Sequence, residues 1–164
     1  MPAVHRGIPS RVSVTVKRVC QNVCMSQQQT ATTSARIMAA FLLTAGVMHF
    51  VNPTFFDNIV PPWLPPSERF WTNVSGIAEL CIGVGLLRGA WRRRAALAAF
   101  GLFVAVYPAN LYMAWDWRDH ALSDQLVAYF RLPLQFGMFW WALSIARANE
   151  LPISGDVLGF QERE

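Results

Sequence analysis

Six polar side chains stand out in this sequence because each one interrupts or borders a long apolar run. They are His49, Ser75, Glu79, Asn110, Arg131 and Gln135. Glu79 is the most conspicuous, since it lies near the middle of the apolar stretch FWTNVSGIAELCIGVGLL, residues 70–87. A charge at the centre of a membrane-spanning helix costs roughly 2.5–3.5 kcal/mol on insertion scales, so it needs a partner, a proton or a function. Together these groups can exchange protons and form hydrogen bonds with a polar ligand.

The composition indicates that the helices carrying these groups cross a membrane. Of the 164 residues, 54% are hydrophobic and only 15% are charged, whereas about 25% are charged in typical soluble domains. The stretch 70–87 covers about 27 Å as a helix, close to the ~30 Å hydrocarbon core of a bilayer. Similar apolar runs occupy residues 34–51, 95–115 and 125–146. We therefore expect an all-α polytopic membrane protein whose domain, residues 34–146, is an antiparallel bundle of four transmembrane helices.

The connections determine how these four helices are joined. The loop 52–69 contains five prolines, which forbid a continuous helix, and its aromatic and aliphatic residues predict that it lies on the membrane surface. The connection 88–94 is so short that the helices on either side must form an antiparallel hairpin. Pro108 and Pro133 lie inside predicted helices and are expected to kink them and open the bundle.

Both ends of the chain are expected to lie outside the bundle. Residues 1–33 are first basic and then polar and low in complexity, which predicts a disordered tail that ends at Ser34, the expected N-cap of the first helix. Two alternatives for this tail stay open, a transit peptide and a translation start at Met25. Residues 147–164 predict a short polar cytoplasmic tail.

Lysine and arginine are distributed unequally between the two sides of this bundle. Eleven of them lie near the two termini and in the connection 88–94, and two, Arg69 and Arg118, lie in the other loops. Cytoplasmic segments of membrane proteins carry the excess of Lys and Arg. We therefore expect a multi-pass protein of the plasma membrane with both termini in the cytoplasm.

With this orientation, the unusual polar residues fall in the outer half of the bundle. At ~1.5 Å per residue, Glu79 and Arg131 differ in depth by about 5 Å, which an arginine stem can bridge, so they are predicted to pair. Ser75 lies one turn from Glu79 on the same face and shares this site. Asn110 and Gln135 are expected to satisfy the remaining donors and acceptors. Two interpretations stay open, a structural pair that fixes helix register and a functional pocket.

The remaining reactive residues, a histidine and three cysteines, give weaker predictions about function. His49, near the outer surface, is either an interfacial residue or a member of the pocket. The cysteines are Cys20, Cys24 and Cys81, without C-x-x-C spacing, so we expect no disulfide framework, zinc site or dithiol redox pair. Cys81 is two positions from Glu79 and should face elsewhere. We expect no metal site and no nucleic-acid partner.

Four motifs follow one another in an order typical of a known family. They are GVMHFVNPTFFDNIVPPWLPP, VSGIAELCIGVGLL, YPANLYMAW and RLPLQFGMFWWAL, within about residues 36–146. This pattern resembles the DoxX-like family of small four-span bacterial membrane proteins. The matching positions are His49, Pro53, Pro61, Pro65, Ser75, Gly76, Glu79, Pro108, Asn110, Arg131, Pro133 and Gln135. The resemblance implies a bacterial inner-membrane protein, and it assigns no catalytic role to any of these residues.

The resemblance also implies a link to redox chemistry. DoxX-like relatives include a subunit of a thiosulfate:quinone oxidoreductase and a membrane partner in a mycobacterial thiol-oxidative-stress complex. We therefore expect an accessory membrane subunit that is not an enzyme on its own, with a pocket for a quinone headgroup or a lipid. Its expected partners are the lipid bilayer, a redox enzyme and a second copy of itself. The alternatives are a small proton-coupled carrier and a scaffold or assembly protein without a small ligand.

Overall fold

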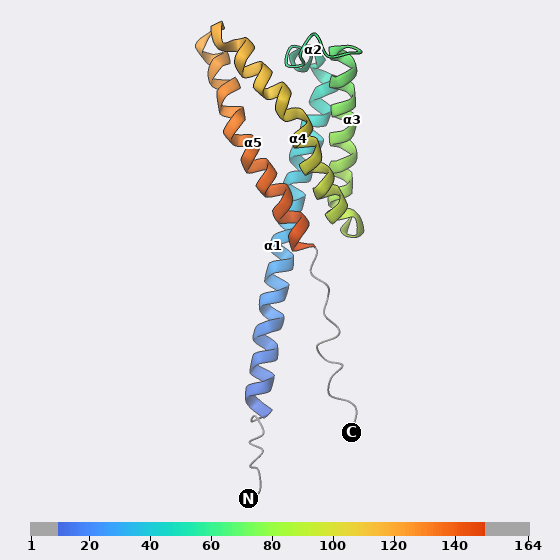
Figure 1. Ribbon diagram of the computed structural model, residues 1–164. Helices are drawn as coiled ribbons and strands as arrows, with labels where there is room; N and C mark the ends of the chain where they lie inside the picture. Colours follow the sequence, from blue (N-terminus) through green and yellow to red (C-terminus); the bar gives the residue numbers. More distant parts are fainter. Residues whose placement is uncertain (1–9, 150–164) are drawn as a thin grey trace, which may run out of the picture.

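The computed structural model describes residues 10–149, which are almost entirely helical (Figure 1). The α-helices within this range are α1 (Ser10–Val51), α2 (Pro53–Asp57), α3 (Glu68–Leu87), α4 (Arg92–Asp116) and α5 (Leu122–Ala148). Two short 3₁₀ helices, η1 (Gly89–Trp91) and η2 (Trp117–Asp119), join α3 to α4 and α4 to α5. No strand occurs between residues 10 and 149, and the all-α prediction is confirmed.

Three helical segments within the described range are long and apolar enough to cross a membrane. They are Arg18–Val51, Glu68–Leu87 and Gly89–Asp119. The fourth long helix, α5, is not one of these three segments, and Arg131 and Gln135 lie in its first half. The ends of α3, α4 and α5 lie within three residues of the ends predicted from the sequence.

The first helix corrects the prediction of a disordered tail over residues 1–33. Helix α1 begins at Ser10 and continues unbroken to Val51, and its first half extends beyond the other helices (Figure 1). Residues 10–45 contain no proline or glycine that would end a helix. The polar residues also fit, since hydroxyls such as Thr30 Oγ1 donate to a carbonyl one turn earlier, at 2.9 Å.

The end points of the two predicted tails also differ from the sequence-based expectation. Ser34 lies inside α1 and does not cap it; its hydroxyl accepts a hydrogen bond of 2.7 Å from Trp141 Nε1 on α5. At the other end, α5 continues to Ala148. The other predicted tail residues, 1–9 and 150–164, lie outside the described residues.

The proline-rich loop after α1 contains one short helix. Pro53 opens α2 at a position where its missing N–H would have no partner in any case. The helix ends after five residues, and no continuous helix follows, as the prolines predict. Ile59 and Pro61 are buried, so part of this loop packs onto the bundle. Its location at a membrane surface stays a prediction.

The four long helices pack as two pairs. Helix α1 lies along α3 and α4 lies along α5, while contact between α1 and α5 is limited. A core cluster formed largely of alanines joins all four helices at the end of the bundle that carries the α3–α4 connection. Its buried residues are Ala35, Met38, Ala39, Leu42, Leu86, Ala95, Ala96, Ala99, Phe103, Ala142, Ile145 and Ala146. A second, smaller cluster lies at the opposite end and contains Ile59, Met113, Ala114 and Ala128.

Candidate functional site

One internal cavity gathers all six polar residues that the sequence predicts. It has a volume of about 200 Å³ and lies between the pair α1–α3 and the pair α4–α5. His49 comes from α1, Ser75 and Glu79 from α3, Asn110 from α4, and Arg131 and Gln135 from α5. The rest of the wall is mostly aromatic and aliphatic, as is common in sites that bind small molecules.

Glycine residues place His49 beside Glu79 by letting α1 and α3 approach closely. A Cβ atom on Gly76 of α3 would lie 2.8 Å from His49 Cβ and 2.9 Å from Phe50 Cε2. On α1, a Cβ atom on Gly46 would lie 3.0 Å from the Gly76 carbonyl oxygen. These spaces are too small for a methyl group, so the crossing of the two helices depends on residues without a side chain.

His49 is buried and has contacts on several sides. Its Nδ1 lies 2.9 Å from the Ala45 carbonyl oxygen, and because a carbonyl can only accept, Nδ1 carries a proton. Phe56 from α2 stacks on the imidazole, with ring centroids 3.7 Å apart. The same Nδ1 lies 3.2 Å from Glu79 Oε2. The structure thus places His49 in the cavity wall.

Glu79 has a carboxylate that is only partly satisfied. Its Oε2 is buried and, among residues 10–149, has no hydrogen-bond partner despite its short distance to His49. The Nδ1 proton is directed at the Ala45 carbonyl, so the contact with Glu79 is electrostatic and is not an aligned hydrogen bond. A buried acceptor without a donor costs about 1–3 kcal/mol. The Glu79 side chain, which lines the cavity, therefore keeps unused capacity to accept a hydrogen bond.

The predicted Glu79–Arg131 ion pair is wrong. Both side chains line the cavity, but within the described residues Glu79 pairs with His49 and Arg131 makes neither an ion pair nor a hydrogen bond. The cause is the pairing of the helices, because α3 lies against α1 and has the cavity between itself and α5. The guanidinium, with its five N–H donors, faces the cavity without an acceptor from residues 10–149.

Asn110 and Gln135 bond to each other and not to the charged residues, which corrects their predicted role. Asn110 Nδ2 donates to Gln135 Oε1 at 3.2 Å, and Gln135 Nε2 donates to the Phe103 carbonyl at 2.7 Å. Pro108 lies inside α4 and has no N–H, and its ring crowds the carbonyls of the preceding turn. The carbonyl that loses its helical donor at Pro108 is that of Val104, the residue after Phe103. Gln135 thus bonds to backbone next to this break, and the two amides link α4 to α5.

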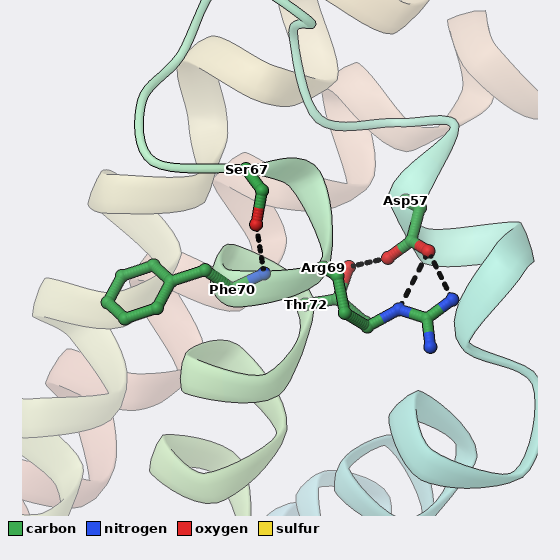
Figure 2. A network of polar contacts seen from close by, with 5 residues as sticks. All are labelled: Asp57, Ser67, Arg69, Phe70 and Thr72. Carbon is green, nitrogen blue, oxygen red and sulfur yellow. Dashed lines mark hydrogen bonds and ion pairs between the residues drawn. The ribbon is translucent and has the colours of Figure 1, made fainter.

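A second polar group, on the outer side of the cavity, involves the loop (Figure 2). Arg69 donates to Asp57 Oδ2 from Nε at 2.9 Å and approaches the same oxygen with Nη2 at 2.7 Å. Thr72 Oγ1 donates to Asp57 Oδ1 at 2.7 Å. The Arg69 guanidinium, aided by Thr72, lowers the pKa of the Asp57 carboxyl below its ordinary value, although partial burial opposes this shift. Ser67 accepts from the Phe70 backbone N–H and caps α3.

Sequence reasoning missed several residues of the cavity. Thr72 lines it and also donates to Asp57, and Phe56 and Val60 reach it from the loop. The signal was present in the hydroxyl of Thr72, one turn before the predicted Ser75. Cys81 is exposed and does not line the cavity, as predicted. Among residues 10–149, no group of three His, Cys, Asp or Glu side chains is placed to hold a metal ion.

Comparison with known proteins identifies the family but no characterised relative. A family described as a domain of unknown function, DUF8561, matches residues 38–146. The chain belongs to the DUF8561 family. The DUF8561 match includes the cavity and all six predicted residues, and most of the bundle described above. No curated protein and no solved structure is significantly similar to this chain.

Proposed function

We propose that this DUF8561 protein is a polytopic protein of the bacterial plasma membrane, DoxX-like, with α1, α3, α4 and α5 as four antiparallel spans and both termini in the cytoplasm. Helix α5 fits this arrangement because the polar residues in its first half face inwards. Arg131 lines the cavity and Gln135 is buried, whereas the outward surface of α5 carries exposed aromatic residues such as Phe130 and Trp140. Charge supports the orientation, since Lys and Arg concentrate near the termini and the connection 88–94.

The function that we propose is binding of a quinone headgroup in the cavity, as an accessory subunit of a redox enzyme. The observation that carries this proposal is a donor and an acceptor side chain in the wall of one cavity. Arg131 has no hydrogen-bond partner in residues 10–149, and Glu79 has an unsatisfied Oε2. A quinone presents carbonyl oxygens that accept hydrogen bonds, and its reduced form presents hydroxyls that donate them. The cavity offers the complement of both forms, with Arg131 for a carbonyl and Glu79 for a hydroxyl.

The electrostatics of the cavity also suit such a ligand. Glu79 and Arg131 carry opposite charges, so a neutral headgroup can enter without adding net charge to a dry site. His49, in contact with Glu79, supplies a second titratable group for protons that accompany reduction of a bound quinone. The volume of about 200 Å³ is below the ~300–1,000 Å³ of pockets that enclose whole drug-sized ligands, so the cavity suits a headgroup.

Extraction of the purified protein tests this proposal. The protein is purified in a mild detergent from its own membrane and extracted with organic solvent, and quinone is measured by absorbance and mass spectrometry. Binding of a short-chain ubiquinone to quinone-free protein is measured in parallel. We expect quinone in the wild type and its loss in Glu79→Gln. Gly101→Ala, a change on α4 with open space around it, is the matched control. If the wild type neither retains nor binds quinone, quinone is not the ligand. If Glu79→Gln retains quinone, the cavity at Glu79 is not the binding site.

The membrane arrangement is tested separately by cysteine labelling. In a background with the natural cysteines replaced by serine, Ser67→Cys and Ser123→Cys should react with an impermeant maleimide on intact cells. Ala90→Cys, in the connection between α3 and α4, should react only after the cells are opened. Labelling of Ala90→Cys alone on intact cells would invert the orientation. Labelling of Ser67→Cys without Ser123→Cys would show that α4 and α5 do not both span the membrane.

A further inference from the structure

Two residues of the cavity wall are more exposed than the others. Of the side chains that line it, Phe41 on α1 and Leu134 on α5 are the two in the exposed class, each about half-exposed at 49%. Both are apolar, although the groups deeper in the cavity are polar. A side chain that lines a cavity and is also exposed on the outside lies at the rim of an opening. The cavity therefore has an apolar rim between α1 and α5.

The packing of the helices explains why the opening lies at this position. Helix α1 packs against α3 and α5 packs against α4, while α1 and α5 make limited contact with each other. Their shared contacts include the alanine-rich core cluster, and beyond it the two helices diverge toward the end that carries α2 (Figure 1). The limited contact between α1 and α5 fits an opening between them at the level of Phe41 and Leu134.

The depth of this rim places it against lipid in the proposed bundle. Phe41 lies ten residues before the end of α1 and Leu134 twelve residues after the start of α5, or ~15 and ~18 Å from the outer helix ends. Both values lie near the middle of a ~30 Å hydrocarbon core. An opening at this depth faces acyl chains and not water.

We propose that the cavity opens sideways into the bilayer through a portal between Phe41 and Leu134, and that its ligand is an amphiphile taken from the membrane. The polar headgroup occupies the cavity, and the apolar tail passes between Phe41 and Leu134 into the lipid. The volume of about 200 Å³ supports this, because it has room for a headgroup but not for a long tail. This inference rests on the proposed four-span arrangement and deepens the proposed ligand binding.

A competing route leads to the cavity from the outer aqueous side. A larger cleft, lined by Asp57, Asp116 and Asp124 among others, adjoins the cavity at Val60, which lines both. Val60 is half-buried, and the neighbouring Ile59 is buried in the smaller core cluster. These two aliphatic side chains separate the polar cleft from the cavity. A water-soluble ligand would have to displace them, whereas an amphiphile reaches the cavity without doing so.

A cysteine in the cavity distinguishes the two routes without requiring a known ligand. Ser75→Cys is made in a background in which Cys20, Cys24 and Cys81 are serine, and the protein is reconstituted in liposomes. Labelling rates are measured with an uncharged lipophilic maleimide and with a sulfonated one, and Ser123→Cys in the outer loop normalises both reagents. We expect the lipophilic reagent to label Ser75→Cys at least ~10-fold faster than the sulfonated one, because a charge partitions poorly into hydrocarbon.

Tryptophan substitutions at the rim then locate the route. Leu134→Trp, and Phe41→Trp as a second variant, should slow lipophilic labelling of Ser75→Cys several-fold. Phe136→Trp is the matched control, since Phe136 is exposed on α5 at 58% and does not line the cavity.

Three outcomes would overturn the portal. They are equal relative labelling by the two reagents, equal slowing by Phe136→Trp and by Leu134→Trp, and absence of labelling by either reagent. Failure of the portal is distinguishable from failure of the proposed quinone binding, because the labelling requires no bound ligand. If quinone co-purifies with the protein but both reagents label it equally, the portal is refuted. The proposal that quinone is the ligand would then still stand.

Discussion

Two clusters of polar side chains that meet on α3 contain similar residue types. They differ in how many of their donors and acceptors have hydrogen-bond partners. The outer group consists of Asp57, Arg69 and Thr72, and each oxygen of its carboxylate receives a hydrogen bond. The cavity group consists of His49, Glu79 and Arg131. Within residues 10–149, its Glu79 Oε2 has no hydrogen bond and its Arg131 has neither an ion pair nor a hydrogen bond.

This difference separates a structural role from a binding role. The outer group connects the loop to the start of α3, and it needs nothing further to complete it (Figure 2). The cavity group leaves a donor and an acceptor unsatisfied in a largely apolar surrounding, which lowers stability. Residues that are unfavourable for folding but complementary to a ligand are expected where a protein binds that ligand.

The largest effect is expected when the arginine of each group is changed to methionine. Arg131→Met removes a guanidinium without a partner in the described structure, so the melting temperature should stay equal or rise. Quinone binding should weaken roughly 10- to 100-fold, the equivalent of a charge-assisted hydrogen bond of ~1.5–3 kcal/mol. Arg69→Met should do the opposite, with a lower melting temperature and unchanged quinone binding. Thermal unfolding in detergent and titration with a short-chain ubiquinone measure the two effects.

The comparison between the two groups fails if this pattern is reversed. A large fall in the melting temperature of Arg131→Met with full quinone binding would give that guanidinium a structural role. Loss of quinone binding in Arg69→Met, without loss of stability, would extend the binding site into the outer group.

The next effect concerns the glycine that joins α3 to α1 at the cavity. In Gly76→Ala the new methyl group would lie 2.8 Å from His49 Cβ, so the two helices must separate and His49 must move from Glu79. Overpacking of this kind costs about 1–3 kcal/mol. We expect a lower melting temperature and weaker quinone binding together.

Glycines elsewhere provide the control for this substitution. Gly101 and Gly137 lie in α4 and α5, and an added Cβ has open space at both positions. Gly101→Ala and Gly137→Ala should be neutral or stabilise the helix by ~0.5–1 kcal/mol, because alanine loses less backbone freedom than glycine. A melting temperature of Gly76→Ala equal to theirs would mean that α1 and α3 do not approach as closely as described.

A smaller effect tests which residue is the true partner of Glu79. Double-mutant cycles with Glu79→Gln are measured against His49→Gln and against Arg131→Met, with unfolding free energy as the readout. Residues in contact couple, whereas residues across a cavity couple weakly. Interhelical polar contacts in membranes average ~0.6 kcal/mol, and we expect about this coupling for His49 and less for Arg131. Stronger coupling to Arg131 would restore the ion pair predicted from the sequence.

These results show what an apolar sequence reveals and what it leaves open. The site residues were predictable because a polar residue in a long apolar run is conspicuous, and all six line one cavity. Their partners were not predictable, because position along a helix gives depth only. The partner of Glu79 depends on which helix lies beside α3, and that is decided by the glycine contact between Gly46 and Gly76.

Most of the helix boundaries could also be predicted from the sequence. The apolar runs predicted α3, α4 and α5 to within three residues at each end. The first half of α1 could not be predicted from polarity and low complexity, which are typical of disordered segments. The absence of proline and glycine over residues 10–45 was the better guide to its conformation.

The smallest effect is a dependence on pH confined to the outer group. The folded-state pKa of Asp57 is lowered from its ordinary value of 3.8, chiefly by the hydrogen bond from Arg69. The stability that Asp57 contributes is therefore fully present above 3.8 and disappears as the pH falls through the lower folded-state pKa. The melting temperature of wild type should exceed that of Asp57→Asn at neutral pH, and the two should converge in acid. The difference should be small, because Arg69 is 53% exposed and water screens the pair.

Comparing these two proteins at each pH isolates Asp57 from the cavity, since the cavity residues are the same in both. Asp119→Asn is the matched control, because Asp119 is 82% exposed and its substitution should leave the melting temperature unchanged throughout. A difference between wild type and Asp57→Asn that grows in acid would have the wrong sign for a lowered pKa. It would show that Arg69 and Thr72 do not stabilise the Asp57 carboxylate in the folded protein.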